Sequence, residues 1–209
     1  MTIALVRYPE ISHWSRPAED KFRVGLQAGH LGVEEHPEEL ERLRNNTGSK
    51  GGGKWEWEVN LEIAERSAAI LESRNINVDI LPATVPPGYW ADIFIAIHAD
   101  GSEDPQNSGF KVAPSWHDLS GKAPELVRIL TEEYQQKTGM TIDENITHNM
   151  RGYYAFSWWR YEHAVHPMTT SAIIETGFLT NAGDRKIIVD NPQIAAEAIS
   201  SAVFSFLGI

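Results

Sequence analysis

A continuous apolar run, Ile93 to Ile97, ends abruptly at His98 and constrains the fold of this chain more than any other stretch. An isoleucine-rich run of this length, bounded by polar residues, is typical of a strand that is covered on both faces. Such strands occur in α/β sheets, where ligands bind outside the carboxyl ends of the strands. His98 is then expected at the functional edge of the sheet. Taken alone, however, it is better interpreted as a histidine that merely ends a core strand.

The surrounding sequence predicts further strands and helices. Phe22–Gln27 has the composition of a strand and runs into His30, so a second strand ends in a histidine. Glu58–Arg74 carries apolar or small residues at helical spacing, and Asn77–Leu81 returns as a strand, which completes a right-handed β-α-β unit. Thr170–Glu175 is a further strand, and it ends in a carboxylate. Other expected elements are a short strand over residues 109–112 and helices over residues 123–137, 184–189 and 192–207.

Length and composition indicate one domain. The chain has 209 residues, of which 42% are hydrophobic, which is enough for one well-filled core and short for two. We expect residues 1–21 to form an N-terminal arm packed on the body and residues 22–209 to form a single domain. Together with the elements above, this predicts a three-layer α/β fold, with a mostly parallel, twisted sheet of about six strands and helices on both faces.

Charge and cysteine content exclude several classes of function. The net charge is −11 and no basic stripe occurs, which argues against a nucleic-acid partner. There is no cysteine, so a metal site has to use histidine, aspartate or glutamate, and no disulfide can form. No apolar stretch is long enough to span a membrane, and residues 1–20 lack the basic start and apolar middle of a signal peptide.

Residues 33–54 are acidic, then polar, then glycine-rich, which is typical of an inserted, mobile loop. Glu34, Glu35 and His36 are residue types that bind metals. Because nothing rigid is expected to position them, we interpret them as a solvated charge cluster.

Four polar side chains are expected to face one crevice: His30, His98 and Glu175 at the carboxyl ends of strands, and Glu56 at the start of a helix. Two imidazoles and one carboxylate form the ligand set of a catalytic zinc site, which keeps a fourth position open for water. Zinc lowers the pKa of bound water from about 15.7 to about 7, and a second carboxylate can carry the proton to a leaving amine. The pattern therefore predicts amide hydrolysis. Spacing leaves open whether Glu56, Glu58 or Glu175 binds the metal.

Four short motifs follow one another along the chain. They are Ala28-Gly29-His30, Glu56-Trp57-Glu58-Val59-Asn60-Leu61, Phe94-Ile95-Ala96-Ile97-His98-Ala99-Asp100 and Ile174-Glu175-Thr176-Gly177-Phe178-Leu179-Thr180-Asn181. In order and context they resemble the zinc-dependent N-acetylmuramoyl-L-alanine amidases, the amidase 3 family of bacterial cell-wall amidases and phage endolysins. The resemblance covers roughly Phe22 to the C-terminus. It implies one zinc ion per chain, held by His30, Glu56 and His98, with Glu175 as the general base.

Three positions depart from the family pattern. Gln27 and Leu31 stand in the first motif, and Gln27 supplies no charged acceptor that would make a metal-bound imidazole more basic. Asp100 replaces the usual asparagine after His98, which partly restores local charge. The insertion over residues 33–54 is longer than the usual link between the first histidine and the glutamate, and we expect it to shape the rim of the cleft. These departures are expected to affect substrate and rate more than the metal.

Arg151, Trp158 and Trp159 are the candidate substrate-binding residues, in an aromatic-rich stretch over residues 145–167. Together with Tyr153, the two tryptophans are of the type that stacks on sugars or peptides. The alternative is that they pack a long irregular loop. Glu175 also has an alternative role, because a carboxylate after a strand can cap a helix or pair with Arg151.

The resemblance implies hydrolysis of the amide between N-acetylmuramic acid and L-alanine of peptidoglycan. An alternative enzyme is a zinc amidohydrolase or carboxypeptidase that acts on a soluble acyl amino acid or peptide, and a non-enzymatic alternative is a peptidoglycan-binding module without turnover. The expected partners are peptidoglycan or muropeptides, without nucleic acid or membrane. We expect a monomer that acts outside the cytoplasm as a secreted, periplasmic or phage-released protein.

Overall fold

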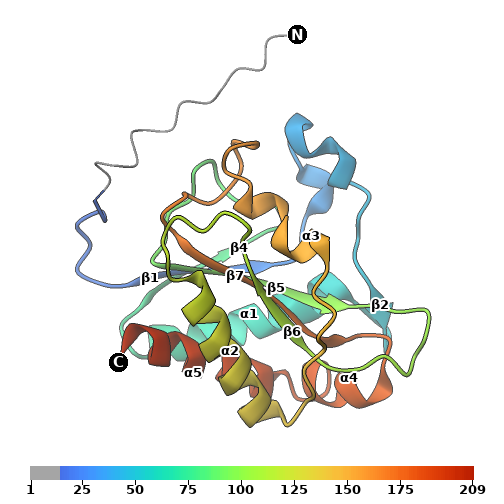
Figure 1. Ribbon diagram of the computed structural model, residues 1–209. Coiled ribbons are helices and arrows are strands. Elements are labelled where there is room, and N and C mark those ends of the chain that lie inside the picture. Colours follow the sequence, from blue (N-terminus) through green and yellow to red (C-terminus); the bar gives the residue numbers. More distant parts are fainter. Residues whose placement is uncertain (1–14) are drawn as a thin grey trace.

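A five-stranded sheet forms the centre of the computed structural model, which describes residues 15–209 (Figure 1). The strands lie in the order β4-β1-β5-β7-β6, and β6 alone is antiparallel to its neighbour. Their bounds are β1 Arg23–Ala28, β4 Asn77–Leu81, β5 Ile93–Asp100, β6 Lys111–Pro114 and β7 Thr170–Phe178. The expected α/β class and mostly parallel sheet are confirmed, with five strands instead of about six.

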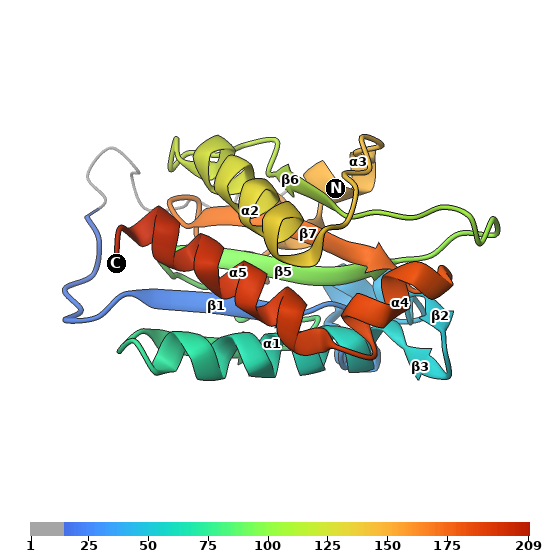
Figure 2. The same ribbon diagram turned by 90° about the horizontal axis from the view of Figure 1, so that it is seen from below.

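Three long helices cover one face of the sheet. They are α1 Glu56–Glu72, α2 Ala123–Thr138 and α5 Pro192–Leu207, and α5 lies between the other two (Figure 2). The short helix α4 Ala182–Ile188 follows β7 and leads into α5. The helix that was expected over residues 58–74 begins two residues earlier, at Glu56, so that this carboxylate belongs to the first turn.

The opposite face has no layer of long helices in the described part of the chain, which corrects the expectation of helices on both faces. Short helical segments cover it instead: η2 Val33–Glu35, η3 Glu38–Leu43, α3 His148–Arg151 and η4 Tyr154–Phe156. Large side chains of the irregular segment over residues 146–165, among them Phe156 and Tyr161, pack on this face and fill the space that a helix would take. The irregular covering leaves room for a cavity, described below.

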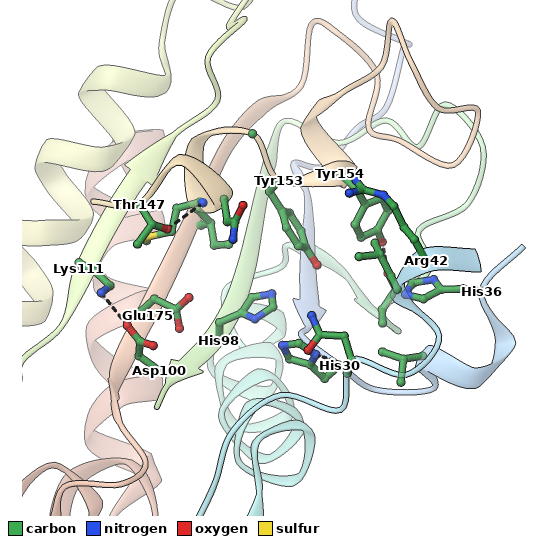
Figure 3. Close-up of a pocket in the computed structure, with 18 residues that line it drawn as sticks. His30, His36, Arg42, His98, Asp100, Lys111, Thr147, Tyr153, Tyr154 and Glu175 are labelled. Atoms are coloured by element: carbon green, nitrogen blue, oxygen red, sulfur yellow. Dashed lines mark hydrogen bonds and ion pairs between the residues drawn. The ribbon is translucent and has the colours of Figure 1, made fainter. Parts of the chain in front are cut away.

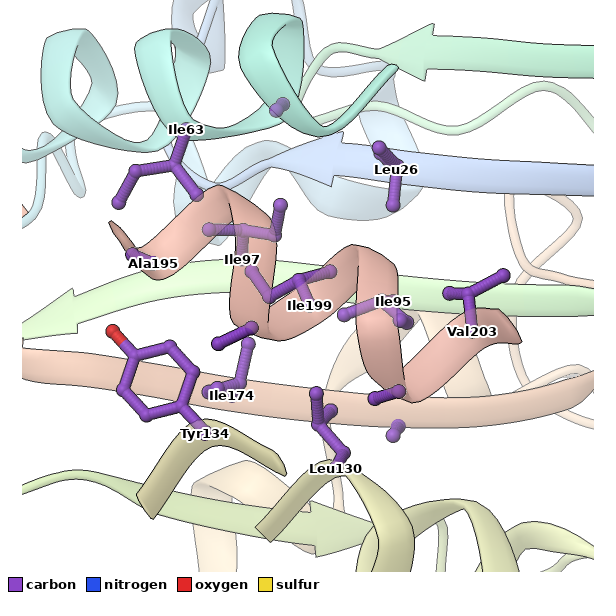
Figure 4. Packing of buried hydrophobic residues seen from close by; sticks show 14 of the residues in the cluster. Leu26, Ile63, Ile95, Ile97, Leu130, Tyr134, Ile174, Ala195, Ile199 and Val203 are labelled. Atoms are coloured by element: carbon purple, nitrogen blue, oxygen red, sulfur yellow. The ribbon is translucent and has the colours of Figure 1, made fainter. Parts of the chain in front are cut away.

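Burial on both faces explains the apolar run in β5. Ile93, Ile95 and Ile97 pack under the three long helices, and Figure 4 shows Ile95 and Ile97 there. Phe94 and Ala96 pack under the irregular segment. All five are fully buried. Successive side chains of a strand point to opposite faces, so His98 continues the row of Phe94 and Ala96. The same rule places Glu175 of β7 on the face of Ile173.

The insertion over residues 33–54 is built from short regular elements. After η2 and η3, a small hairpin joins β2 Lys50–Gly51 to β3 Lys54–Trp55 and leads directly into α1. Glu34 and Glu35 are exposed, as expected. His36 is not part of a solvated cluster: it is buried, and its Nδ1 lies 2.7 Å from Oγ1 of Thr84. The side chain packs against the body because the 3-10 turns fold the segment back on it.

The N-terminal arm was expected over residues 1–21, and residues 1–14 lie outside the described part of the chain. In residues 15–21, Arg16 forms an ion pair of 2.6 Å with Asp92 at the start of β5. Among residues 15–209, none of the helices is both long and apolar enough to cross a membrane.

Candidate metal centre and active-site cavity

The pairing of β1 with β5 brings the two histidines together. Ala28 is in register with Ile97, and the amide of Gly29 donates to the Ile97 carbonyl at 2.9 Å, so the turn after β1 lies beside His98. His30 has a left-handed backbone (φ 64°), which non-glycine residues adopt rarely and mostly at turns or functional sites. The two imidazole centroids are 5.0 Å apart.

Glu56 supplies the carboxylate between them. Its Oε1 lies 3.1 Å from Nδ1 of His98 and 3.4 Å from Nε2 of His30. The side chain is buried, and Oε1 also accepts a hydrogen bond from the Ala99 amide at 3.1 Å. Burial by itself would raise the pKa of Glu56, but the hydrogen bond with His98 and the charges of both imidazoles outweigh it and lower the pKa to about 2.

Two further contacts fix the Glu56 carboxylate. The amide of Ser49 donates to Oε2 at 2.7 Å, and the Ser49 hydroxyl donates to the Ala99 carbonyl at 2.8 Å, which ties the insertion to β5. Asn60, one turn further along α1, donates to Oε1 at 3.3 Å and to the Gly29 carbonyl at 3.1 Å. The buried amide thus links the helix to the turn that carries His30.

These three side chains fit a divalent metal ion. One potential ligand atom of each lies within 4.8 Å of those of the other two. Nε2 of His98 is buried without a hydrogen-bond partner in the described residues, a costly state that a ligand would relieve. Burial lowers the pKa of His30, which favours the neutral imidazole that binds metals. Two nitrogens and one oxygen with no thiolate match the donors of catalytic zinc sites.

A cavity of about 430 Å³ opens next to this cluster, on the sheet face that lacks long helices (Figure 3). His30, His98 and Glu175 all line it. Glu175 is in register with His98 of β5 on one side and with Lys111 of β6 on the other. Three adjacent strands therefore present a histidine, a glutamate and a lysine to the same face.

The charge around Glu175 is set by its neighbours. Burial raises the pKa of Glu175 well above its ordinary value, the negative charges of Glu56 and Asp100 raise it further, and Lys111 lowers it. Lys111 is itself buried, and its Nζ lies 2.6 Å from Asp100 and 2.8 Å from Asp143. Asp100, which departs from the family pattern, is thus the partner of a buried lysine.

Gln27, another of the three departures, forms no hydrogen bond with the two histidines in the described residues. It is fully buried, and its Nε2 donates to the carbonyls of Pro82 and Ala83 at 3.2 and 3.0 Å and to the Tyr154 hydroxyl at 2.9 Å. Tyr154 in turn donates to the Ala83 carbonyl. Gln27 therefore holds a wall of the cavity rather than orienting a metal ligand.

Neither Glu58 as a metal ligand nor Glu175 as a helix cap or a partner of Arg151 matches the positions of these side chains. Glu58 accepts a hydrogen bond from the Trp55 amide at 2.8 Å and caps the first turn of α1, outside the cluster. Glu175 lies within β7, and the Arg151 guanidinium lies over the Trp116 ring, 5.5 Å from its centroid. No ion pair joins Glu175 to Arg151 in residues 15–209.

The three candidate substrate-binding residues do not line the cavity. Trp159 is 45% exposed and meets the His117 ring, at 4.3 Å between centroids, while Trp158 packs edge-on against Trp159. Arg151 likewise points to Trp116. Tyr153 does line the cavity, with its ring centroid 5.3 Å from that of His98. Sequence reasoning did not assign His36, Arg42 or Lys111 to the site, and all three line the cavity.

Comparisons with known proteins agree with this fold. The catalytic domain of CwlV, an N-acetylmuramoyl-L-alanine amidase from Bacillus (Paenibacillus) polymyxa var. colistinus, is 17% identical, with a TM-score of 0.62 over 90% of this chain and 99% of that one. The amidase Ami1 from Mycobacterium smegmatis is 17% identical, with a TM-score of 0.66 over 90% and 97%. The catalytic domain of the CD27L endolysin, which targets Clostridia difficile, is 16% identical, with a TM-score of 0.57 over 90% and 97%.

At these identities the likeness establishes a shared fold. A comparison with curated protein sequences found no match. The model of the N-acetylmuramoyl-L-alanine amidase family Amidase_3 matches residues 87–205, which include His98 and Glu175. Because this match spans more than half of the sequence, the chain belongs to the N-acetylmuramoyl-L-alanine amidase family.

Proposed function

We propose that this amidase cleaves the bond between N-acetylmuramic acid and L-alanine with one zinc ion held by His30, Glu56 and His98 and with Glu175 as the general base. The observation that carries the proposal is the convergence of the three ligand atoms within 4.8 Å, beside a cavity that Glu175 also lines. The reaction is proposed from family membership, and the roles of metal ligand and general base are proposed from the arrangement of these four residues.

The roles follow from the position of each group. Zinc, when bound, supplies a Lewis acid that lowers the pKa of water and polarises a carbonyl. The carboxylate of Glu175 takes a proton from the attacking water, and its protonated form then delivers that proton to the α-amine of the departing L-alanine. Its raised pKa suits the second step, because burial and the nearby carboxylates favour the protonated carboxyl. Lys111 opposes that shift and so helps to keep the base ionised for the first step.

The remaining residues of the site position these groups. Asn60 and Ser49 hold the Glu56 carboxylate, and the left-handed turn at His30 directs its imidazole toward Glu56. Tyr153 covers His98 and limits the access of bulk water to it. A dry site strengthens the electrostatic interactions on which the reaction depends.

Peptidoglycan or muropeptides are the proposed substrates, and the proposed place of action is outside the cytoplasm, where cell-wall amidases and endolysins work. We propose that the chain acts as a monomer, because the donors and the base all come from one chain.

Replacement of Glu175 by glutamine tests the role of the base. The variant should bind zinc at wild-type stoichiometry, measured by native mass spectrometry, and cleave muropeptides about 10² to 10⁴ times more slowly, as expected for the loss of a general base. The matched control is Glu58→Gln, which removes a carboxylate from the same molecule outside the cavity and should keep both properties. Full cleavage by the Glu175 variant with zinc bound would show that the base is another group.

A further inference from the structure

The cavity has two permanently charged cations in its walls, and their surroundings differ. Lys111 has carboxylates at 2.6 and 2.8 Å, so its charge is matched. Arg42 has no carboxylate within 4.0 Å among residues 15–209; its Nη2 donates to the neutral hydroxyl of Tyr161 at 2.9 Å. In Figure 3 the two cations border the cavity at opposite ends, with His30 and His98 between them. One end of the cavity therefore carries a cation that has no ion-pair partner among the described residues.

The position of Arg42 distinguishes it from the other arginines without an ion pair. The net charge is −11, and five of the ten arginines in residues 15–209 have acidic partners within 4.0 Å, such as Arg16 with Asp92 at 2.6 Å and Arg128 with Glu132 at 2.7 Å. Of the five without one, Arg42 alone lines the cavity. Arg42 belongs to η3, within the insertion over residues 33–54, and lies outside the residues that the family model matches.

The contacts around Arg42 hold it in place while keeping its charge available. Tyr161 is 6% exposed and anchors one end of the guanidinium without neutralising it. A guanidinium has five N–H donors, so several remain for a ligand. Arg44 Nε donates to the His36 carbonyl at 2.7 Å and fixes the turn before η3. The planar fork of an arginine matches a carboxylate with two parallel hydrogen bonds.

We propose that Arg42 binds a carboxylate of the peptide part of the substrate. The inference rests on the proposed function: the carboxyl group of the muramoyl moiety is consumed in the scissile amide, so a free carboxylate of such a substrate lies on the alanine side. That carboxylate would otherwise enter a cavity bordered by Asp100 and Glu175. Arg42 thus determines on which side of the metal centre the peptide lies.

The test compares two probes that differ only in charge, N-acetylmuramoyl-L-alanine and its C-terminal carboxamide. The wild-type protein should have a KM about tenfold lower for the carboxylate, the size expected for one hydrogen-bonded charge at a partly exposed site. Arg42→Gln should abolish this preference through KM and leave kcat unchanged, because the lost interaction stabilises the bound substrate and the transition state equally. Arg42→Lys should restore part of it. Arg128→Gln on α2 removes the same charge far from the cavity and should keep the preference.

A third probe, N-acetylmuramoyl-L-alanyl-glycine, moves the free carboxylate one residue further along the peptide. A charge preference that Arg42→Gln abolishes supports the proposal, whether it is found with the alanine probe or with the alanyl-glycine probe. The probe that shows the preference identifies which carboxylate is bound. Equal losses for carboxylate and carboxamide would overturn the proposal and assign Arg42 a structural role with Tyr161. Calorimetry with the same probes separates the proposed amidase function from the proposed role of Arg42. Tighter binding of the carboxylate without cleavage refutes the amidase function alone. Cleavage without a charge preference refutes the role of Arg42 alone.

Discussion

Gly29 is the residue whose replacement should disturb the metal centre most selectively. A Cβ at this position would lie 2.5 to 2.6 Å from the His98 ring, whereas ordinary contact begins near 3.4 Å. The imidazole therefore has to withdraw by about 0.8 to 0.9 Å, which is about four times the tolerance of about 0.2 Å in metal–ligand distances. Gly29 has no positive φ, so alanine adds no backbone strain. We predict that Gly29→Ala weakens zinc binding by about 100-fold.

The assay is competition for zinc with a chromophoric chelator, combined with urea denaturation of the metal-free protein. Gly25→Ala is the matched control, because it adds the same methyl group four residues earlier, within β1, 2.6 Å from the Tyr89 ring and away from the cavity. It should lower stability by about 1 to 3 kcal/mol, as overpacking does, and leave zinc affinity unchanged. Wild-type zinc affinity in Gly29→Ala would refute the assignment of His98 as a ligand.

Three further predictions concern the surroundings of the site. Asn60→Ala should weaken zinc binding about tenfold in the same competition assay, because Glu56 loses the amide that orients it. Lys111→Met should lower the free energy of unfolding by about 3 to 5 kcal/mol in urea titrations, since two carboxylates lose their buried partner. Burial raises the pKa of Glu39, but hydrogen bonds from residues 162 and 163 outweigh it, so the pKa is lowered in the folded protein. Glu39 should therefore contribute stability above pH 4.5, and this stability is lost as the pH falls through the folded pKa. The advantage of the wild type over Glu39→Gln in denaturation midpoints should therefore shrink below pH 4.5, and an advantage that grew there would contradict the assignment.

The strands and their chemistry were predictable because local patterns fix them. An apolar run that ends at His98 has to be buried on both faces, and the parallel pairing of β5 with β1 and β7 then brings neighbouring strand ends to one edge. The resemblance to the amidase family is confirmed by the match over residues 87–205. That match begins after His30 and Glu56, and it is the register of β1 with β5 and the start of α1 that bring these two residues to His98.

The residues that sequence reasoning missed depend on long-range packing. Arg42 and His36 belong to the insertion, whose polar composition indicated a solvated loop, yet tertiary contacts such as that of His36 with Thr84 fold it onto the cavity. Lys111 was missed because a lysine in a short strand ordinarily points to solvent, and only Asp100 and Asp143 explain its burial. The aromatic stretch offered several candidates, and sequence could not rank Tyr153 above its neighbours, because no periodic pattern shows which side chains face inward.

The central claim is that a metal centre at the ends of β1 and β5 cleaves the muramoyl-alanine amide with Glu175 as the base. The most direct test is mass spectrometry of purified peptidoglycan digested by the zinc-loaded protein and by the protein after chelation. The proposal predicts peptides with a free N-terminal alanine from the zinc-loaded protein, and none after chelation. Fragments cut within the peptide or glycan, or equal release of free alanine termini after chelation, would contradict it.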